Sequence, residues 1–326
     1  MKNYIFTIAI AALGLFAAQA GIRGDVNGDG SVTASDVTAI YSFLLNDDSS
    51  NLVSGDVNGD GSITAGDVTA VYNILLNGAE QEMPEYIDFE VNGVTFRMIY
   101  VKGGTFTMGN DNMASESPAH SVTLTDFYIA ETECTQALWK ALFPDYSHFA
   151  NVGDQKPCNG QWYSEILQFA DALNAYLHES GALAADKSFM LPTEAQWEWA
   201  ARGGVKSNGY TYAGSNNIDD VAWYAANSGN VVHDVKLKAS NELGLYDMSG
   251  NAFEATTDNF SVDYSWAADG ETDPTGSPTA SSYGLTRRGG SCSQTANRCT
   301  VTKRDFNDID FNGGASEDMS FRLILK

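Results

Sequence analysis

Residues 191–204 read L-P-T-E-A-Q-W-E-W-A-A-R-G-G, and the rest of the larger domain can be interpreted outward from this stretch. Thr193, followed three residues later by Gln196, forms a capping box, in which each side chain binds an otherwise unpaired N–H group at the start of a helix. Gly203 is typical of a helix end, because glycine takes the left-handed backbone conformation without strain. The stretch therefore predicts a helix that begins at Thr193 and ends at Gly203.

The chain before this helix alternates between strand and helix patterns. Tyr86–Val91 and Thr95–Val101 alternate in hydropathy and are separated by Asn92-Gly93, which predicts a hairpin. Further predicted elements are strands at Gly103–Gly109 and Ser121–Ile129 and helices at Thr135–Phe143 and Ser164–Ser180. Beyond Gly204 we expect loops and short strands, since no helical period is sustained there. The expected fold class is α+β, with an irregular, loop-rich large domain.

The N-terminus has the pattern of a secretory signal peptide. Lys2 precedes an apolar run from Tyr4 to Ala18, and Ala-Gln-Ala stands before Gly21. The apolar run is too short for a good membrane span. We expect cleavage after Ala20 and a secreted protein, extracellular or at the cell surface, whose four cysteines meet oxidising conditions.

A repeat follows the signal peptide. D-V-N-G-D-G-S-V-T-A-S-D begins at Asp25, and D-V-N-G-D-G-S-I-T-A-G-D begins at Asp56. Both have the spacing of a twelve-residue calcium loop, with glycine (Gly30, Gly61) at the sharp turn. The predicted Ca²⁺ ligands are Asp25, Asn27, Asp29, Ser31 and Asp36 in the first loop, and Asp56, Asn58, Asp60, Ser62 and Asp67 in the second, the serines through their backbone carbonyls.

Each loop runs into a short helix pattern, with apolar residues at helical spacing from Val37 to Leu45 and from Val68 to Leu76. Because two such short stripes bury each other only when the loops are held, calcium binding and folding should be coupled. Paired loop–helix units closed by Asp resemble a dockerin domain of type I. This resemblance implies docking onto a cohesin-like domain and assembly into an extracellular complex. The hydroxyl pair common in cellulosomal dockerins is replaced by Ala34-Ser35 and Ala65-Gly66. This departure affects the expected docking partner more than the expected fold.

The large domain carries four characteristic segments. They are G-G-T-F-T-M-G (103–109), residues 191–204, N-E-L-G-L-Y-D-M-S-G-N-A-F-E (241–254), and R-G-G-S…S-F-R-L (288–323). In this order they resemble the formylglycine-generating enzyme, or sulfatase-modifying factor, family. The resemblance implies a fold related to C-type lectins. Active members oxidise a sulfatase cysteine to formylglycine, using O₂ and a copper ion held by two cysteines. The expected segments are a signal peptide (1–20), a dockerin-like module (21–78), a linker (79–86) and this domain (87–326).

The resemblance places the two copper cysteines three and eight residues after the serine of R-G-G-S. Here Cys299 occupies the eighth position, but Gln294 occupies the third and Cys292 the first. In an extended strand Cys292 would lie about 7 Å from position 294, so copper binding is doubtful. Three states are open: disulfides, with Cys292 joined to Cys299 and Cys134 to Cys158; a shifted copper site at Cys292 and Cys299; or free thiols. Export favours the disulfides.

The family also binds a structural Ca²⁺. The resemblance maps its ligands onto Asp247 and Glu254, as carboxylates, and onto Gly250 and Ala252, as backbone carbonyls. Two carboxylates and two carbonyls suit the oxygen shell of calcium. Other positions also differ from the family pattern, since G-N-A-F-E-A (250–255) lacks the two tryptophans that are usual in this segment.

The net charge and the absence of several catalytic motifs exclude some classes of partner and enzyme. A formal net charge of −24 argues against nucleic-acid and anionic-membrane partners. The sequence contains no H-E-x-x-H, G-x-S-x-G or phosphate-loop motif, and its four histidines are scattered. Glu194 and Glu198 lie inside the helix motif and are expected to cap or pack it rather than hydrolyse sugars. Two hypotheses remain: a secreted, polysaccharide-associated binding protein whose large domain is a pseudoenzyme with a protein or glycan ligand, or a copper oxidase of formylglycine-generating type. The missing thiol at Gln294 favours the first.

Overall fold

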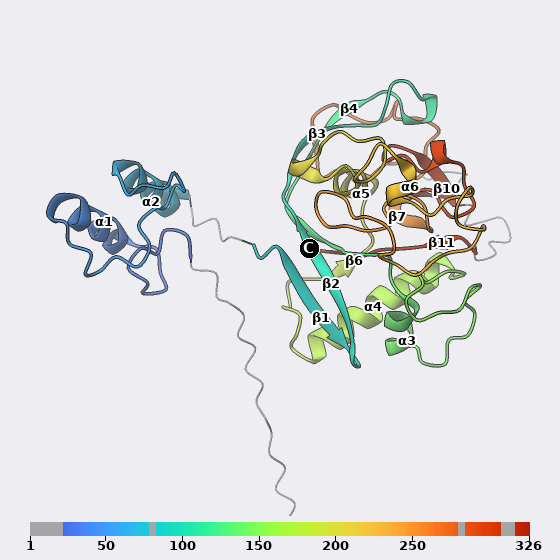
Figure 1. The fold of residues 1–326 in the computed structure, drawn as a ribbon, viewed down its shortest axis with the longest axis horizontal. Helices are drawn as coiled ribbons and strands as arrows, with labels where there is room; N and C mark the ends of the chain where they lie inside the picture. Colours follow the sequence, from blue (N-terminus) through green and yellow to red (C-terminus); the bar gives the residue numbers. More distant parts are fainter. Residues whose placement is uncertain (1–21, 78–82, 280–283, 308–316) are drawn as a thin grey trace, which may run out of the picture. The chain divides into compact units, whose positions relative to one another are not determined.

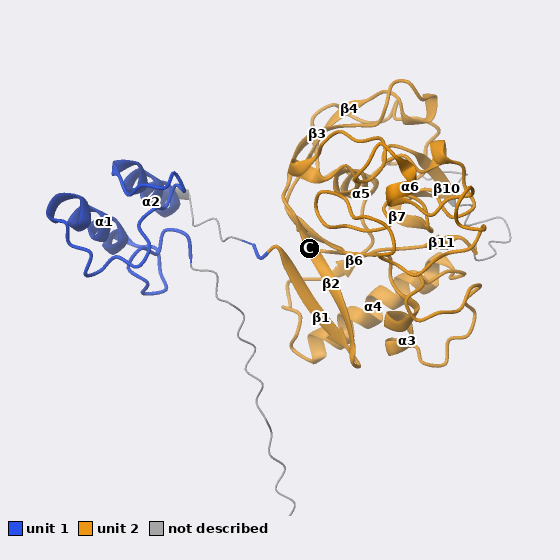
Figure 2. Ribbon diagram, viewed as in Figure 1, with its two compact units in different colours: residues 1–84 blue, residues 85–326 orange. Residues whose placement is uncertain are grey.

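The computed structural model describes residues 22–77, 83–279, 284–307 and 317–326, and the predicted signal peptide and the first half of the predicted linker (79–82) lie outside these ranges. The chain divides into two compact units, residues 1–84 and 85–326 (Figure 2). The boundary falls within the predicted linker. No helix among the described residues is long and apolar enough to span a membrane.

The N-terminal unit contains helices α1 (Ala34–Asn46) and α2 (Ala65–Asn77). Thr33 caps α1 and forms a capping box with Asp36. The two helices bury one small cluster, which includes Val37 and Ile40 of α1 and Val68 and Val71 of α2. The predicted apolar stripes are thus confirmed for their first turns only. Tyr41, Leu44 and Leu45, and their repeats Tyr72, Leu75 and Leu76, are exposed.

The hairpin of the larger unit forms as predicted. Strands β1 (Tyr86–Val91) and β2 (Val94–Val101) pair in antiparallel register, with Val91 opposite Val94 across the Asn92-Gly93 turn. They belong to a five-stranded sheet of order β1-β2-β5-β12-β6, completed by β5 (Phe127–Ala130), β6 (Phe189–Met190) and β12 (Ile324–Leu325). The last described strand therefore pairs between two strands that lie more than 130 residues earlier in the chain (Figure 1).

Two smaller sheets complete the domain. One has the order β10-β9-β7-β11, with β7 (Phe253–Asn259), β9 (Leu285–Arg288), β10 (Arg304–Asn307) and β11 (Met319–Ser320). The other has the order β3-β4-β8, with β3 (Gly104–Met108), β4 (His120–Leu124) and β8 (Glu271–Thr272). The prediction of one strand at Ser121–Ile129 is wrong. Thr125 and Asp126 break it, and Asp126 Oδ1 accepts a hydrogen bond from the Gly103 N–H at 2.8 Å, so β4 and β5 join different sheets.

The three predicted helices of the larger unit are confirmed. They are α3 (Gln136–Leu142), α4 (Tyr163–Glu179) and α5 (Glu194–Ala201). The capping box of α5 is present, since Gln196 N donates to Thr193 Oγ1 at 3.2 Å and Thr193 N donates to Gln196 Oε1 at 2.9 Å. Helix α4 packs on α3 beside the β1–β2 hairpin (Figure 1), whereas α5 is buried on β3, β7 and β9. After α5, the helices of the described chain are one short α-helix, α6 (Ile218–Val221), and short 3₁₀ turns, and the remaining elements are the strands β7 to β12.

Candidate functional site

The segment around α5 is organised by buried ion pairs. Glu194 binds Arg304, with Nε–Oε1 at 2.5 Å, and accepts a hydrogen bond from the Tyr264 hydroxyl at 2.9 Å. Glu198 is fully buried and pairs with Arg288. Burial acts to raise the pKa of Glu198, but Arg288 and the hydrogen bonds it accepts outweigh that effect and hold the pKa below its usual value. These two glutamates anchor α5 to β9 and β10, which confirms the prediction that they pack the helix.

A third buried pair involves a predicted calcium ligand. Glu254 accepts hydrogen bonds from Arg322 at both carboxylate oxygens, Nε–Oε2 at 2.6 Å and Nη2–Oε1 at 2.7 Å. The Trp197 indole N–H also donates to Oε2 at 2.7 Å. Arg322 and Glu254 are both fully buried. The Glu254 carboxylate is therefore neutralised and hydrogen-bonded by protein groups.

Asp247, the other predicted carboxylate ligand, has a different environment. Its Oδ2 accepts a hydrogen bond from Lys236 N at 2.9 Å, whereas its Oδ1 is buried and has no hydrogen-bond partner in the described chain. Burial is the largest cause that raises the pKa of Asp247 to about 6. A bound cation would suit the unpaired oxygen, but Glu254 is already occupied by Arg322. The predicted four-ligand calcium set thus fits this structure only in part, and the site stays a prediction.

Glu133 was not identified from the sequence, and it completes this buried group. Its carboxylate accepts hydrogen bonds from the Ala252 N–H and from Asn251 Nδ2, both at 3.0 Å. Burial is the main cause that raises its pKa well above the usual value, and nearby Asp247 raises it further. Glu133 lies more than one hundred residues before its partners, so no local sequence signal points to it.

The predicted cysteine site is divided between two environments. Cys292 packs with Val232 and Ala252, whereas Cys299 packs in a separate small cluster with Ile218 and Ala222. Both are free thiols, so the predicted Cys292–Cys299 disulfide is wrong for this structure. The physical reason is that each sulfur is enclosed by apolar side chains of its own cluster. Burial raises the pKa of each thiol to about 12.

The paired glycine explains how this stretch folds. A Cβ atom on Gly290 would lie 2.7 Å from Cys299 Sγ and 2.6 Å from the Arg298 carbonyl oxygen, so only glycine fits. At the family's first copper position, the Gln294 backbone carbonyl accepts a hydrogen bond from Ala225 N at 2.9 Å. The sequence puts an amide side chain, not a thiol, at this position, and the hydrogen bond holds its backbone.

Cys134 and Cys158 come together, as the sequence predicts for a second bridge, but they are also free thiols. Their sulfur atoms lie 3.8 Å apart, longer than the roughly 2.05 Å of a disulfide bond.

The predicted calcium loops of the N-terminal unit have matching internal geometry. Asp25 accepts hydrogen bonds from Asp29 N and Gly30 N, and Asp56 accepts the equivalent bonds from Asp60 N and Gly61 N. The closing residues Asp36 and Asp67 are buried, and each accepts three backbone N–H groups at 2.7–3.0 Å. Gly30 and Gly61 take φ values of +87° and +86°, as the predicted turn requires. The loop carboxylates thus accept backbone N–H groups, and no group of three or more His, Cys, Asp or Glu side chains among the described residues is arranged to hold a metal ion, so the calcium ligands stay a prediction.

The larger unit also has an open hollow of about 490 Å³ beside α3 and α4. Three aromatic residues line it, Trp139, Phe143 and Tyr146, together with the polar residues Asp145, His148, Glu165 and Gln168. The indole N–H of Trp139 is buried and finds no acceptor in the parts of the chain that the structure describes. A ligand in the hollow would meet aromatic rings and polar side chains.

The matches to known families cover both units. Residues 88–326 match the Sulfatase-modifying factor enzyme 1-like domain, and residues 23–53 and 54–95 match the Dockerin type I domain. The second dockerin match runs past the boundary between the two units and into β2. Dockerin type I domains bind calcium and imply cohesin binding, which supports both expectations for the N-terminal unit.

The relatives differ in activity. The Chaperone protein LppX of Paenibacillus barcinonensis is 30% identical over 199 residues, which cover 48% of this chain and 69% of that protein. The Formylglycine-generating enzyme of Streptomyces coelicolor is 25% identical over 274 residues, covering 66% and 86%. The Inactive C-alpha-formylglycine-generating enzyme 2 of Bos taurus is 25% identical over 222 residues, covering 52% and 73%.

A solved structure shares the fold of the larger unit. The Treponema denticola variable protein 1 has a TM-score of 0.64 and 28% identity, covering 74% of this chain and 99% of that one. The mixed helices and curled sheets are consistent with the expected α+β class. The chain belongs to the sulfatase-modifying factor enzyme 1-like family and carries a dockerin type I domain at its N-terminus.

Proposed function

We propose that this is an exported, non-enzymatic binding protein, in which the dockerin attaches the chain to a cohesin-bearing assembly and the larger domain binds a neutral glycan. Export follows from the signal-peptide pattern of residues 1–20 and agrees with the extracellular context typical of dockerins. The dockerin supplies the attachment and has no chemistry of its own.

The absence of copper oxidase activity is inferred from the separation of Cys292 and Cys299. Copper in active members needs two thiolates at one fixed, short separation. In this chain Gln294 stands at the first thiol position, and Cys292 and Cys299 lie in separate apolar clusters. Since burial also raises the pKa of both thiols to about 12, neither is a thiolate near neutral pH. These residues do not fit a copper ion.

Copper binding and peptide conversion test this inference. We expect no stoichiometric Cu(I) uptake by the reduced full chain, measured by competition with a Cu(I) chelator. We also expect no conversion of a sulfatase-cysteine peptide by mass spectrometry, with the Streptomyces coelicolor enzyme as the positive control. Gln294→Cys, which restores a thiol at the first position, is the matched variant and should take up more Cu(I) than the wild type. Peptide conversion by the wild type, or Cu(I) binding lost in Cys299→Ser, would favour the copper oxidase instead.

The hollow beside α3 and α4 supports a glycan as the ligand. Sugar rings present both C–H faces that stack on aromatic rings and hydroxyl groups that donate and accept hydrogen bonds. The hollow offers the Phe143 and Tyr146 rings for stacking, and the Glu165 and Gln168 side chains for hydrogen bonds. A net charge of −24 disfavours polyanionic glycans. The ligand class is therefore a neutral polysaccharide.

Affinity gel electrophoresis tests the ligand. Laminarin, xylan and galactomannan serve as neutral probes, and heparin serves as the anionic control. We expect retardation by at least one neutral probe and none by heparin. Gln168→Ala should weaken it, whereas Val205→Ala, an exposed position outside the hollow, should not. Equal migration with all probes would reject the glycan ligand without affecting the attachment role of the dockerin.

A further inference from the structure

We propose that Cys134 and Cys158 form an oxidisable thiol pair, which closes to a disulfide by exchange with a small disulfide molecule that reaches Cys134 through the adjoining cavity. This role is independent of the proposed glycan binding. It concerns residues outside the stretch in which the family holds copper.

The backbone already holds the two residues opposite each other. Thr135 and Pro157 form an isolated antiparallel bridge, and Cys134 and Cys158 are the next pair along it. The Cys158 N–H donates to the Cys134 carbonyl oxygen at 2.7 Å. The Cys134 N–H donates instead to the Phe321 carbonyl oxygen at 2.8 Å, so the two residues share one backbone hydrogen bond. Opposite residues in antiparallel strands have Cα atoms about 4.5–5.5 Å apart, within the range that a disulfide bridges. The sulfurs, at 3.8 Å, therefore need side-chain rotation but no backbone movement.

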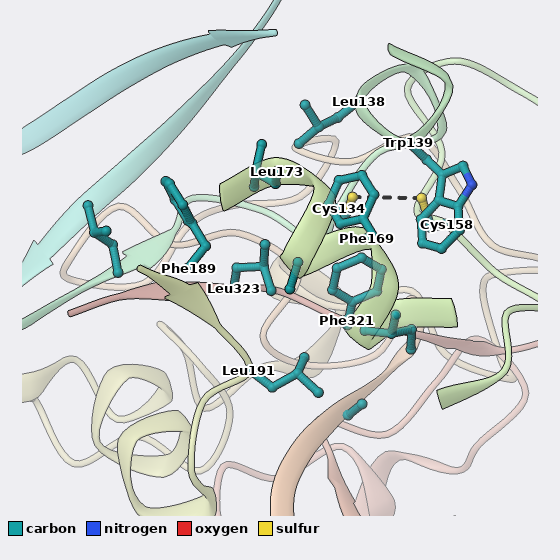
Figure 3. Close-up of a cluster of buried hydrophobic side chains, with 14 of the residues drawn as sticks. Cys134, Leu138, Trp139, Cys158, Phe169, Leu173, Phe189, Leu191, Phe321 and Leu323 are labelled. Carbon is teal, nitrogen blue, oxygen red and sulfur yellow. Dashed lines mark hydrogen bonds between the residues drawn. The ribbon is translucent and has the colours of Figure 1, made fainter. Parts of the chain in front are cut away.

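Both thiols are buried, and one of the two residues borders a cavity. Both sulfurs lie in the main apolar cluster, close to Trp139, Phe169 and Phe321 (Figure 3). Cys158 is fully buried. Cys134 is also buried, with 6% of its surface exposed, but it lines a cavity of about 340 Å³ that is also bounded by β2 and Leu138, and Cys158 is not part of that lining. A small reagent can therefore reach Cys134 first.

This asymmetry sets the order of the chemistry. The Cys134 thiolate attacks one sulfur of a small disulfide such as oxidised glutathione, so that a mixed disulfide forms and one glutathione thiolate leaves. The Cys158 thiol then loses its proton, attacks the Cys134 sulfur and releases the second glutathione. The two protein thiols are oxidised and lose two protons, while oxidised glutathione is reduced to two molecules of glutathione. Burial raises the pKa of Cys158 well above its usual value, and contact with the Cys134 sulfur adds to this effect.

The reaction is specific to this pair. The other two thiols, Cys292 and Cys299, lie in separate clusters, so neither has a partner in position. Closing the Cys134–Cys158 bond joins the segments that lead into α3 and α4, and it should stabilise the folded state by restricting the unfolded chain.

The test uses the full chain, isolated reduced and then equilibrated with oxidised glutathione under native conditions. Peptide mapping by mass spectrometry should find Cys134 linked to Cys158, with Cys292 and Cys299 still reduced. The oxidised protein should unfold at a higher urea concentration than the reduced protein. Cys292→Ser is the matched control and should leave both results unchanged.

Single valine substitutions test the order of attack. Cys158→Val should stop at a glutathione adduct on Cys134, whereas Cys134→Val should accumulate no adduct on Cys158. The proposal is overturned if all four thiols of the folded wild type stay reduced, if the linkage involves Cys292 or Cys299, or if Cys158 is modified in preference to Cys134.

Discussion

Replacing Glu254 with Gln should destabilise the larger domain by about 3 kcal/mol. Arg322 is fully buried, and Glu254 is the carboxylate that pairs with it at both oxygens. Loss of one partner of a buried pair costs about 3–5 kcal/mol, because the remaining charge is uncompensated. The lower value applies here, since Gln keeps one carbonyl oxygen and Arg322 keeps its hydrogen bonds to the Ala130 and Tyr246 carbonyls.

Tryptophan fluorescence during urea unfolding isolates this effect, because all six tryptophans (Trp139 to Trp266) lie in the larger domain. The experiment is run in excess calcium and again in EDTA. The control, Asp88→Asn, breaks an exposed pair with Arg97, whose side chains are 39% and 37% accessible, and should cost under about 1 kcal/mol.

Two results would refute the reasoning. If Glu254→Gln costs no more than Asp88→Asn, the buried pair does not stabilise the fold as argued. If the cost of Glu254→Gln appears only in calcium, and EDTA alone destabilises the wild-type larger domain, then Glu254 is a calcium ligand, as the sequence predicts.

Three further predictions follow from the burial and hydrogen bonding of single residues. Burial raises the pKa of Asp258 from 3.8 to about 7, so the folded protein holds this proton more tightly than the unfolded chain does. The protonated Asp258 therefore contributes on the order of 4 kcal/mol to the free energy of unfolding below pH 3.8, and this contribution is lost as the pH rises to 7. Asp258→Asn should flatten the dependence of stability on pH over this range, and an unchanged dependence would contradict the reasoning. Asp36→Ala should bind one calcium ion fewer than the wild type in a calorimetric titration, with Asp67→Ala equivalent; an unchanged number of bound ions would reject the loop assignment. Thr193→Ala should cost about 1 kcal/mol and Thr193→Ser much less, since Thr193 Oγ1 caps α5; equal costs would rule out the cap.

Local signals in the sequence were sufficient for several elements. The Asn92-Gly93 turn fixes the register of the β1–β2 hairpin, and the capping box at Thr193 fixes the start of α5. The calcium loops could also be predicted, because every ligand and the turn glycine lie within twelve consecutive residues. In each case the residues that specify the structure are close together in the chain.

Long-range contacts explain what the sequence did not reveal. The spacing of Asp247 and Glu254 suggests a calcium site, but the partner of Glu254 is Arg322, 68 residues later. The alternation through Ser121–Ile129 suggests one strand, yet the hydrogen bond from the Gly103 N–H to Asp126 separates it into two. Likewise, the spacing of Cys292 and Cys299 did not show that different apolar clusters enclose the two sulfurs.

The position of β12 limits when the larger domain can finish folding. Ile324 and Leu325 pair with β5 on one side and with β6 on the other, so the five-stranded sheet has a gap until these residues are available. A ribosome shields the most recently made segment of a nascent polypeptide, so the sheet cannot close during synthesis of this part of the chain. Removal of the last three residues would expose two unpaired strand edges, which are sites for aggregation.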